Sequence, residues 1–240
     1  MLLNWRTDDC SAREKIIGTI FDAGAIRKND LQWILQMSEP RLKRELHKLR
    51  VKSTPPLIQW LPVSFSNYRD HVYTLTRSGV EKAHEMIGIE SRITTTEMQI
   101  RHMLGLNEVL FRFLRKFGFD GVAWQSTREA TETLLLLRVD GTETTESDLR
   151  TSVIRPDAIL TLNDQWWWVE FDNNTETSLK LYKKYRMYIR NLEPLDESFH
   201  HVVWVTKNEK RRDSMKKIWD KLNEKKIQMR FFVEGNEVFE

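Results

Sequence analysis

The sequence has almost no cysteine and no long uncharged hydrophobic run. Its single cysteine, Cys10, excludes an internal disulfide and a zinc site built on cysteine ligands. No segment is long and apolar enough to span a membrane, and the N-terminus lacks the basic-then-apolar pattern of a signal peptide. We therefore expect a protein of the reducing cytoplasm that has no membrane partner.

Motifs built on histidine or glycine are also missing. Of the six histidines, only His200 and His201 are neighbours, and neighbouring residues on a strand point to opposite faces. The chain contains no glycine-rich phosphate loop, Rossmann fingerprint or Ser/His/Asp arrangement. These absences argue against a histidine metal cluster and against the common nucleotide-binding enzymes.

Charge is present but unevenly distributed along the 240 residues. Residues 120–172 hold 4 basic and 11 acidic side chains, whereas residues 173–230 hold 15 basic and 8 acidic ones. Packed together, these segments would place an acidic pocket beside a basic surface. That arrangement suits metal-assisted work on a phosphate backbone, and it equally suits a domain held together by salt bridges.

The N-terminal part shows the periodicity of short helices followed by two strands. The expected elements are helices over Ala12–Ala25, from Asn29 and from Ser38, strands over Leu57–Val63 and His71–Leu75, and a helix over Val80–Ile87. Ser38 is expected to cap the third helix, whose buried stripe is Leu42, Leu46 and Leu49. This order is the helix-turn-helix arrangement with a wing.

The segment YTLTRSGVEKAHEM (residues 73–86) resembles the end of many bacterial winged-helix domains, and the resemblance covers residues 11–88. It implies a duplex DNA partner, bound by basic side chains on the third helix and the wing: Arg41, Lys43, Arg44, His47, Lys48 and Arg69. The alternative is a winged helix used for protein contacts, with a basic face that is merely solvated.

The C-terminal part predicts an α/β domain with a central mixed sheet. The expected elements are a helix over Glu97–Phe117, strands over Val122–Gln125 and Glu132–Val139, a hairpin within residues 153–171, helices over Thr177–Leu192 and Lys210–Lys225, and strands over Phe199–Thr206 and Ile227–Val233. We expect residues 140–150 to form an exposed loop. The predicted domains are residues 1–90 and residues 91–240.

The hairpin is the most informative element, because its two strands carry acids. A two-residue turn at Asn163-Asp164 would pair residues whose numbers sum to 327. Asp157 then lies opposite Glu170, and Arg155 opposite Asp172, all four on one face. A turn centred on Asp164-Gln165 would instead pair Asp157 with Asp172, which favours a metal.

The hairpin motif resembles two known groups of proteins. Pro156-Asp157 followed by Glu170-Phe171-Asp172, between helices, is similar to the signature of the PD-(D/E)XK nuclease superfamily, which implies a restriction-endonuclease-like fold. The segments RPDA (155–158) and VEFD (169–172), with Thr175 before a basic helix, resemble the replication-relaxation proteins of bacterial plasmids and integrative elements.

The nuclease resemblance implies that Asp157 and Glu170, with Glu108 as a possible upstream acid, bind Mg²⁺ or Mn²⁺. Asp172 stands where that superfamily usually has a lysine, although some members have an acid there. Lys180 and Lys184 of the next helix are the candidates to replace the lysine. The competing interpretation is a salt bridge between Arg155 and Asp172, which would neutralise the acidic face and leave a nuclease-like scaffold without turnover.

Three functions follow as hypotheses. The preferred one, taken from the family resemblance, is a DNA-binding accessory protein for replication or transfer of a mobile element, with replication or relaxase proteins as partners. The second is a Mg²⁺-dependent endonuclease or nickase using Asp157 and Glu170. The third is a dimeric transcriptional regulator whose C-terminal domain serves dimerisation.

Overall fold

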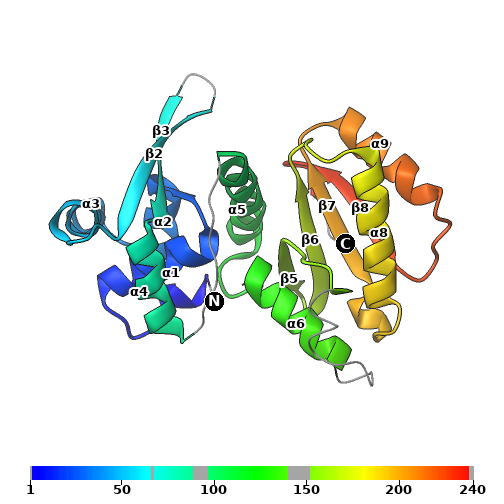
Figure 1. Cartoon of the computed structure of the whole chain (residues 1–240), viewed down its shortest axis with the longest axis horizontal. Coiled ribbons are helices and arrows are strands. Elements are labelled where there is room, and N and C mark those ends of the chain that lie inside the picture. Colours follow the sequence, from blue (N-terminus) through cyan, green and yellow to red (C-terminus); the bar gives the residue numbers. More distant parts are fainter. Residues whose placement is uncertain (1, 66–67, 89–96, 140–151, 238–240) are drawn as a thin grey trace. The chain divides into compact units, whose positions relative to one another are not determined.

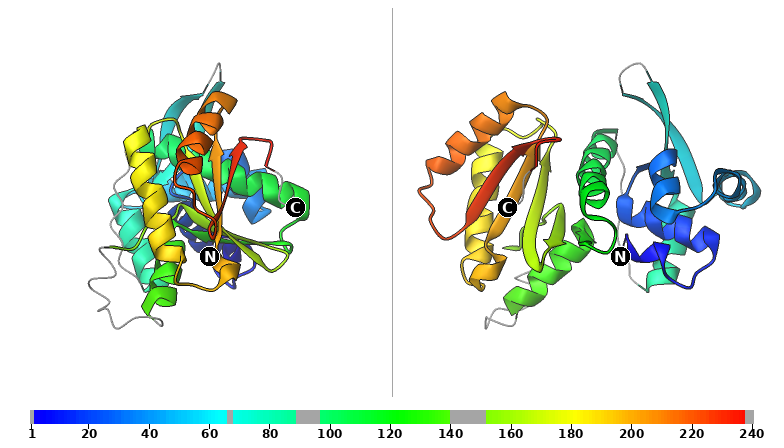
Figure 2. Two further views of the ribbon diagram at one scale, coloured as in Figure 1. Left: turned by 90° about the vertical axis from the view of Figure 1, so that its right-hand side faces the viewer. Right: turned by 180° about the vertical axis from the view of Figure 1, so that it is seen from behind.

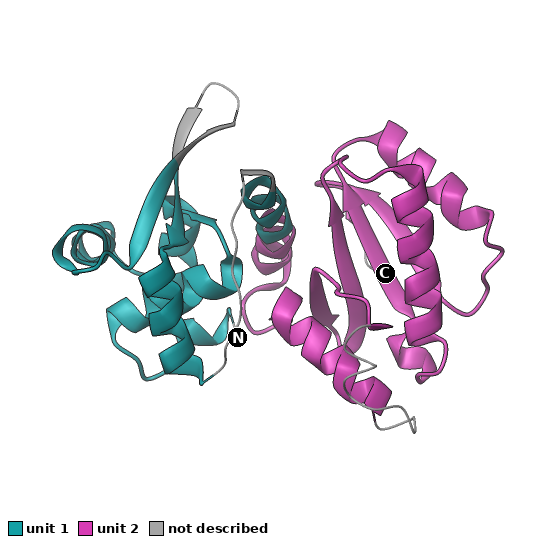
Figure 3. Ribbon diagram, in the orientation of Figure 1, with its two compact units in different colours: residues 1–107 teal, residues 108–240 magenta. Residues whose placement is uncertain are grey.

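The computed structural model describes residues 2–65, 68–88, 97–139 and 152–237 of the chain (Figure 1). The chain divides into two compact units, residues 1–107 and 108–240, which Figure 3 shows in different colours. The division falls inside the long helix α5 (Glu97–Phe117), which has the bounds expected from the sequence. The predicted boundary between residues 90 and 91 lies outside the described residues and stays a prediction. None of the described helices is long and apolar enough to cross a membrane.

Unit 1 consists of short helices and a three-stranded antiparallel sheet. Its elements in chain order are η1 (Asn4–Arg6), α1 (Ala12–Ala23), β1 (Ile26–Arg27), α2 (Lys28–Leu35), α3 (Glu39–His47), η2 (Lys48–Lys52), β2 (Ile58–Phe65), β3 (Tyr68–Leu75) and α4 (Arg77–Ile87). The strand order in the sheet is β1-β3-β2. The three expected helices and both expected strands are confirmed in order, with shifts of a few residues at their ends.

The first half of α5 is part of unit 1. Ile100 and Leu104 pack with Ala25 and Val72 in one buried cluster. Asn107 is buried, and its Nδ2 donates hydrogen bonds to the carbonyl oxygens of Ala23, the last residue of α1, at 3.1 Å and of Ala25, just after it, at 2.8 Å. These bonds give the buried amide of Asn107 its partners and hold α5 against the segment that follows α1.

Unit 2 is an α/β unit around a mixed five-stranded sheet. Its remaining elements are β4 (Val122–Ser126), α6 (Thr127–Val139), β5 (Ala158–Leu162), β6 (Gln165–Asp172), α8 (Ser178–Leu192), η3 (Glu197–Phe199), β7 (His201–Thr206), α9 (Glu209–Asp220) and β8 (Gln228–Val233). The strand order is β4-β5-β6-β7-β8. The first three strands are antiparallel neighbours, whereas β6, β7 and β8 run parallel and are joined by α8 and α9.

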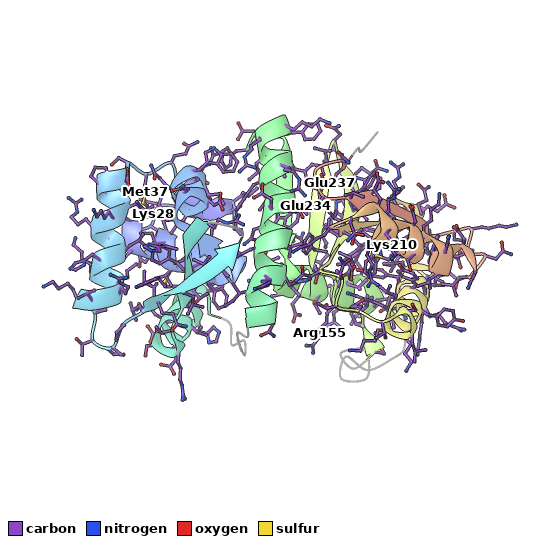
Figure 4. All side chains as sticks on the ribbon, turned by 90° about the horizontal axis from the view of Figure 1, so that it is seen from above. Lys28, Met37, Arg155, Lys210, Glu234 and Glu237 are labelled. Carbon is purple, nitrogen blue, oxygen red and sulfur yellow. The ribbon has the colours of Figure 1, made fainter. Side chains whose placement is uncertain are left out.

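Helices α6, α8 and α9 share one buried cluster with the sheet, so they cover the same face of it (Figures 1 and 2). The cluster holds Trp168 and Trp204 from the strands, Tyr185 and Tyr188 from α8, and Trp219 from α9. The sheet is also tied to the second half of α5. Arg112 of α5 forms ion pairs with Glu234 and Glu237, which Figure 4 labels.

The register of the β5–β6 hairpin is confirmed. Ala158 pairs with Val169 and Leu162 with Gln165, so partner numbers sum to 327. The turn residues Asn163 and Asp164 have φ angles of 50° and 60°, as a two-residue turn of type I′ requires. The alternative turn centred one residue later is therefore excluded.

The strand expected over Glu132–Val139 is wrong, because these residues belong to helix α6. The apolar run TLLLL favours a strand, yet a start signal for a helix stands ahead of it. Glu129 accepts hydrogen bonds from the backbone N–H and the hydroxyl of Ser126, at 3.0 and 3.1 Å. Ser-x-x-Glu is a pattern that begins helices. Its hydrogen bonds between side chain and backbone start a helix here, and the apolar run continues it.

Candidate functional site

Two carboxylates of β6 face the helical layer and are buried. Side chains alternate along a strand, so Trp168, Glu170 and Asp172 point to the side covered by α8 and α9. Glu170 is 0% exposed and Asp172 3% exposed. A buried carboxylate is costly unless it is paired and hydrogen-bonded, so each of them needs partners from the helices above.

Helix α8 supplies the partners of Glu170. The Nζ of Lys184 lies 2.6 Å from its Oε2, and the hydroxyl of Tyr188 donates to its Oε1 at 2.6 Å. Lys184 and Tyr188 are four residues apart, so they lie one above the other on one face of the helix. We call Asp157, Glu170, Lys184 and Tyr188 the Glu170 centre.

Burial raises the pKa of Glu170 well above its ordinary value, Lys184 opposes that shift, and the negative charge of Asp157 adds to it. The pKa of Lys184 is raised in spite of burial, because the carboxylates of Glu170 and Asp157 favour its charged form. Its ammonium group also lies 5.0 Å from the ring centre of Trp204, a cation–π contact. The centre therefore holds a positive charge that is stabilised on several sides.

Asp157 stands just before β5 and is half-buried. Its Oδ2 accepts a hydrogen bond of 2.8 Å from the backbone N–H of Phe171 on β6. The predicted proximity of Asp157 to Glu170 is thus found, and the backbone of β6 occupies one oxygen of Asp157.

The predicted salt bridge between Arg155 and Asp172 is wrong. Asp172 instead pairs with Arg211 of α9, whose Nε lies 2.6 Å from Oδ2 and whose Nη2 lies 2.9 Å from Oδ1. Arg211 also donates to the carbonyl of Glu176 at 2.8 Å. Arg155 is exposed (Figure 4). It precedes Pro156 and lies outside the β5 ladder, which begins at Ala158, so the cross-strand pairing does not extend to it.

The carboxylates do not form a three-acid metal site. Both oxygens of Glu170 already accept from Lys184 and Tyr188, and Oε1 of Glu108 accepts from Arg115 at 2.9 Å. Within the described residues, no group of three or more His, Cys, Asp or Glu side chains is arranged to hold a metal ion. The donor set that the nuclease resemblance implied for Mg²⁺ or Mn²⁺ therefore does not fit this arrangement.

Of the two lysines expected to replace the missing motif lysine, the structure places Lys184 at Glu170 and leaves Lys180 exposed one turn earlier. The start of α8 is set by Thr177, whose hydroxyl accepts from the backbone N–H of Lys180 at 3.4 Å. That start fixes which lysine of the helix faces the sheet.

The second candidate site is the basic side of α3 in unit 1. Ser38 precedes the helix as expected, and Leu42, Leu46 and Leu49 are its buried stripe. Five cations form what we call the α3 cation face: Arg41, Lys43, Arg44, His47 and Lys48. Lys48 is half-buried, and the other four are exposed. The side chain of Arg69 lies outside the described residues.

Glu45, which sequence reasoning did not single out, is buried beneath this face. Its carboxylate accepts from Lys48 at 2.9 Å, from Arg13 at 3.1 Å and from Arg44 at 3.4 Å. The hydrogen bond from Lys48 lowers the pKa of Glu45 to about 2, against the effect of burial and with help from Arg13 and Arg44. Two cations of the face are thus oriented by an acid, whereas Arg41, Lys43 and His47 form no salt bridge with any described residue.

Residues 36–196, two thirds of the chain, match the replication-relaxation family. The chain belongs to the replication-relaxation family. The matched region includes α3, the β5–β6 hairpin and all of α8. No curated protein and no solved structure matches the chain.

Three residues of this replication-relaxation protein escaped the sequence reasoning. Tyr188 lies on the buried face of its helix, and its spacing of four from Lys184 is the signal that could have found it. Arg211 lies 39 residues after Asp172, and no local pattern connects the two. Glu45 follows the cations Arg41, Lys43 and Arg44 in α3, and this position is the signal that could have found it.

The pairing at Glu170 gives a stability prediction. We expect Lys184→Met to lower the free energy of unfolding by about 3 kcal/mol, because it leaves a buried carboxylate without its cation. Tyr188→Phe removes one hydrogen bond and should cost about 1–3 kcal/mol. Lys180→Met, on the exposed side, should stay within about 0.5 kcal/mol of wild type. Urea unfolding followed by tryptophan fluorescence measures all three, and equal losses for the two lysines would contradict the assignment.

The lowered pKa of Glu45 gives a pH prediction. Because its folded-state pKa of about 2 lies below the ordinary value of 4.5, its stabilisation is full above pH 4.5 and is lost as the pH falls from 4.5 toward 2. We expect Glu45→Gln to cost about 1 kcal/mol at neutral pH, a modest value because Arg13 and Arg44 are more than half exposed. Urea unfolding of both proteins at several pH values should show this difference shrinking below pH 4.5 and vanishing near pH 2. A difference that stays constant with pH would refute the ion pairs as its cause.

Proposed function

We propose that this member of the replication-relaxation family is a DNA-binding accessory protein for replication or transfer of a mobile genetic element. In this proposal unit 1 is a winged helix that binds duplex DNA through α3. The role in replication or transfer rests on the family, and the duplex partner rests on α3. Replication or relaxase proteins and a second copy of the chain are further proposed partners.

The order of elements supports the winged helix. The chain runs α1-β1-α2-α3-β2-β3, and its small sheet has the order β1-β3-β2. In this topology α3 follows α2 after a short turn and is the helix that would enter a major groove. The antiparallel pair β2–β3 is the corresponding wing.

The observation that carries the proposal is the α3 cation face. Its exposed cations stand on the side of α3 opposite the buried leucines, at the ends of side chains long enough to reach phosphates or base edges. Glu45 orients Arg44 and Lys48 and leaves Arg41 and Lys43 available for an external anion. A polyanion with accessible edges is the partner that this arrangement suits best.

The test is duplex binding by the full chain. Replacing Arg41 and Lys43 together by alanine should weaken binding to a labelled duplex and lower the slope of log affinity against log salt by about 2, one for each lost phosphate contact. The control is the double variant Arg77→Ala, Lys82→Ala on α4, which removes the same two kinds of side chain from unit 1. If both double variants bind as tightly as wild type, α3 is not the DNA-binding helix.

A second candidate function, metal-dependent nicking, is favoured by one observation: Lys184 stands at Glu170, where it restores the lysine that the motif lacks. In our preferred proposal the Glu170 centre stabilises the fold and cleaves nothing, because both oxygens of Glu170 accept hydrogen bonds from Lys184 and Tyr188. Wild-type protein should therefore leave supercoiled plasmid intact with Mg²⁺ or Mn²⁺. Nicking by wild type that is lost in Asp157→Ala would establish the nuclease instead.

A further inference from the structure

Helix α8 has a second, outward side that the Glu170 centre does not use. Its inward side is buried through Leu181, Tyr185, Tyr188 and Leu192. Its outward side we call the α8 outer face, and it consists of Leu179, Lys180, Tyr182, Lys183, Arg186, Met187 and Arg190. All seven side chains are exposed, so the helix carries a complete core-facing side and a separate surface.

The α8 outer face contains large apolar side chains in water. Leu179 is 64% exposed, Met187 38% and Tyr182 37%. Half of the exposed large hydrophobic side chains among the described residues lie on this one helix, since the others are Val51, Trp60 and Leu136. Exposed apolar side chains grouped in this way are typical of an interaction surface, whereas a face that is merely solvated carries them singly.

The same face is strongly cationic. Helix α8 contains no acidic residue, and Lys180, Lys183, Arg186 and Arg190 form no salt bridge with any described residue. They recur every three or four residues over a length of about 15 Å, given a rise of 1.5 Å per residue. A row of unpaired cations at regular spacing is complementary to a chain of regularly spaced negative charges.

One of these cations, Arg190, also repels a cation on α6. Burial lowers the pKa of Arg138 on α6, and the positive charge of Arg190 lowers it further. Arg190 therefore lies close enough to Arg138 for the two positive charges to repel each other. An anion bound along α8 would relieve this repulsion.

We propose that the α8 outer face binds single-stranded nucleic acid. The cations contact successive phosphates, and the exposed ring of Tyr182, with Leu179 one turn before it, packs against unpaired bases. Cations combined with an exposed aromatic ring are the composition of surfaces that hold single strands. A duplex hides its base faces and would leave the three apolar side chains without a partner, whereas a continuous polyanion matches the whole row of cations better than the scattered carboxylates of a protein.

This site goes beyond the proposed duplex binding, because it lies on another helix and in the other unit. The Glu170 centre contributes only by holding α8 on the sheet through Lys184, whose side chain points inward. Either site can therefore exist without the other.

The experiment measures binding of the full chain to a labelled oligothymidylate strand by fluorescence anisotropy over a range of salt concentrations. The double variant Lys183→Ala, Arg186→Ala should weaken binding and lower the salt slope by about 1.4, since each phosphate contact on a single strand contributes about 0.7. Tyr182→Ala should weaken binding roughly five- to 150-fold with no change in the salt slope, because it removes stacking and no charge. Far-UV circular dichroism confirms that the variants are folded.

Two controls make the result specific. Lys216→Ala, Lys217→Ala removes two exposed cations from α9 and should leave binding of the strand unchanged. Arg41→Ala, Lys43→Ala should also leave it unchanged, so a failure of the α3 proposal does not affect this one. The proposal is overturned if the α9 variant weakens binding as much as the α8 variant, if Tyr182→Ala has no effect, or if duplex or polyglutamate displaces the strand as well as unlabelled oligothymidylate does.

Discussion

The buried carboxylate of Glu170 is the constraint on which the arrangement of unit 2 depends. It lies on β6, the middle strand of the sheet, where water does not reach it. A charge in that position requires donors, and only the helix that covers the strand can provide them. Lys184 and Tyr188 do so from one face of α8, which fixes both the rotation of the helix and its position along β6. Because α8 leads into β7, the same contacts also position the parallel part of the sheet.

The neighbouring ion pair extends this principle to α9. Arg211 binds both oxygens of Asp172 and reaches the carbonyl of Glu176, so it connects the end of β6, the segment before α8 and the start of α9. Two buried acids on one strand thus orient two helices. Lys184 and Arg211 are directed inward, whereas the remaining cations of α8 form no salt bridge with the residues that the structure describes and lie on its outer surface. Two acids of the acidic segment thus pair in the interior with two cations of the basic segment that follows it.

The sequence predicted local features well and long-range pairings poorly. The register of the β5–β6 hairpin followed from the turn residues Asn163-Asp164, because a two-residue turn sets the pairing by itself. The exposure of the α3 cations followed from helical periodicity. The partner of Asp172 was misassigned, since Arg211 enters through the packing of α9, which no spacing in the sequence encodes. The region around Glu132 was misread as a strand because an apolar run was weighted above the Ser126–Glu129 start signal. Duplex binding and the α8 outer face remain proposals.

The central claim is that both oxygens of Glu170 are bonded within the protein and hold no metal. A crystal structure of the wild-type protein soaked with Mn²⁺ tests it most directly, with anomalous scattering used to locate the metal. We expect Lys184 Nζ and the Tyr188 hydroxyl to stay bonded to Glu170, with no anomalous peak between Asp157 and Glu170. A manganese ion bound by these two carboxylates, with Lys184 displaced from Glu170, would contradict it.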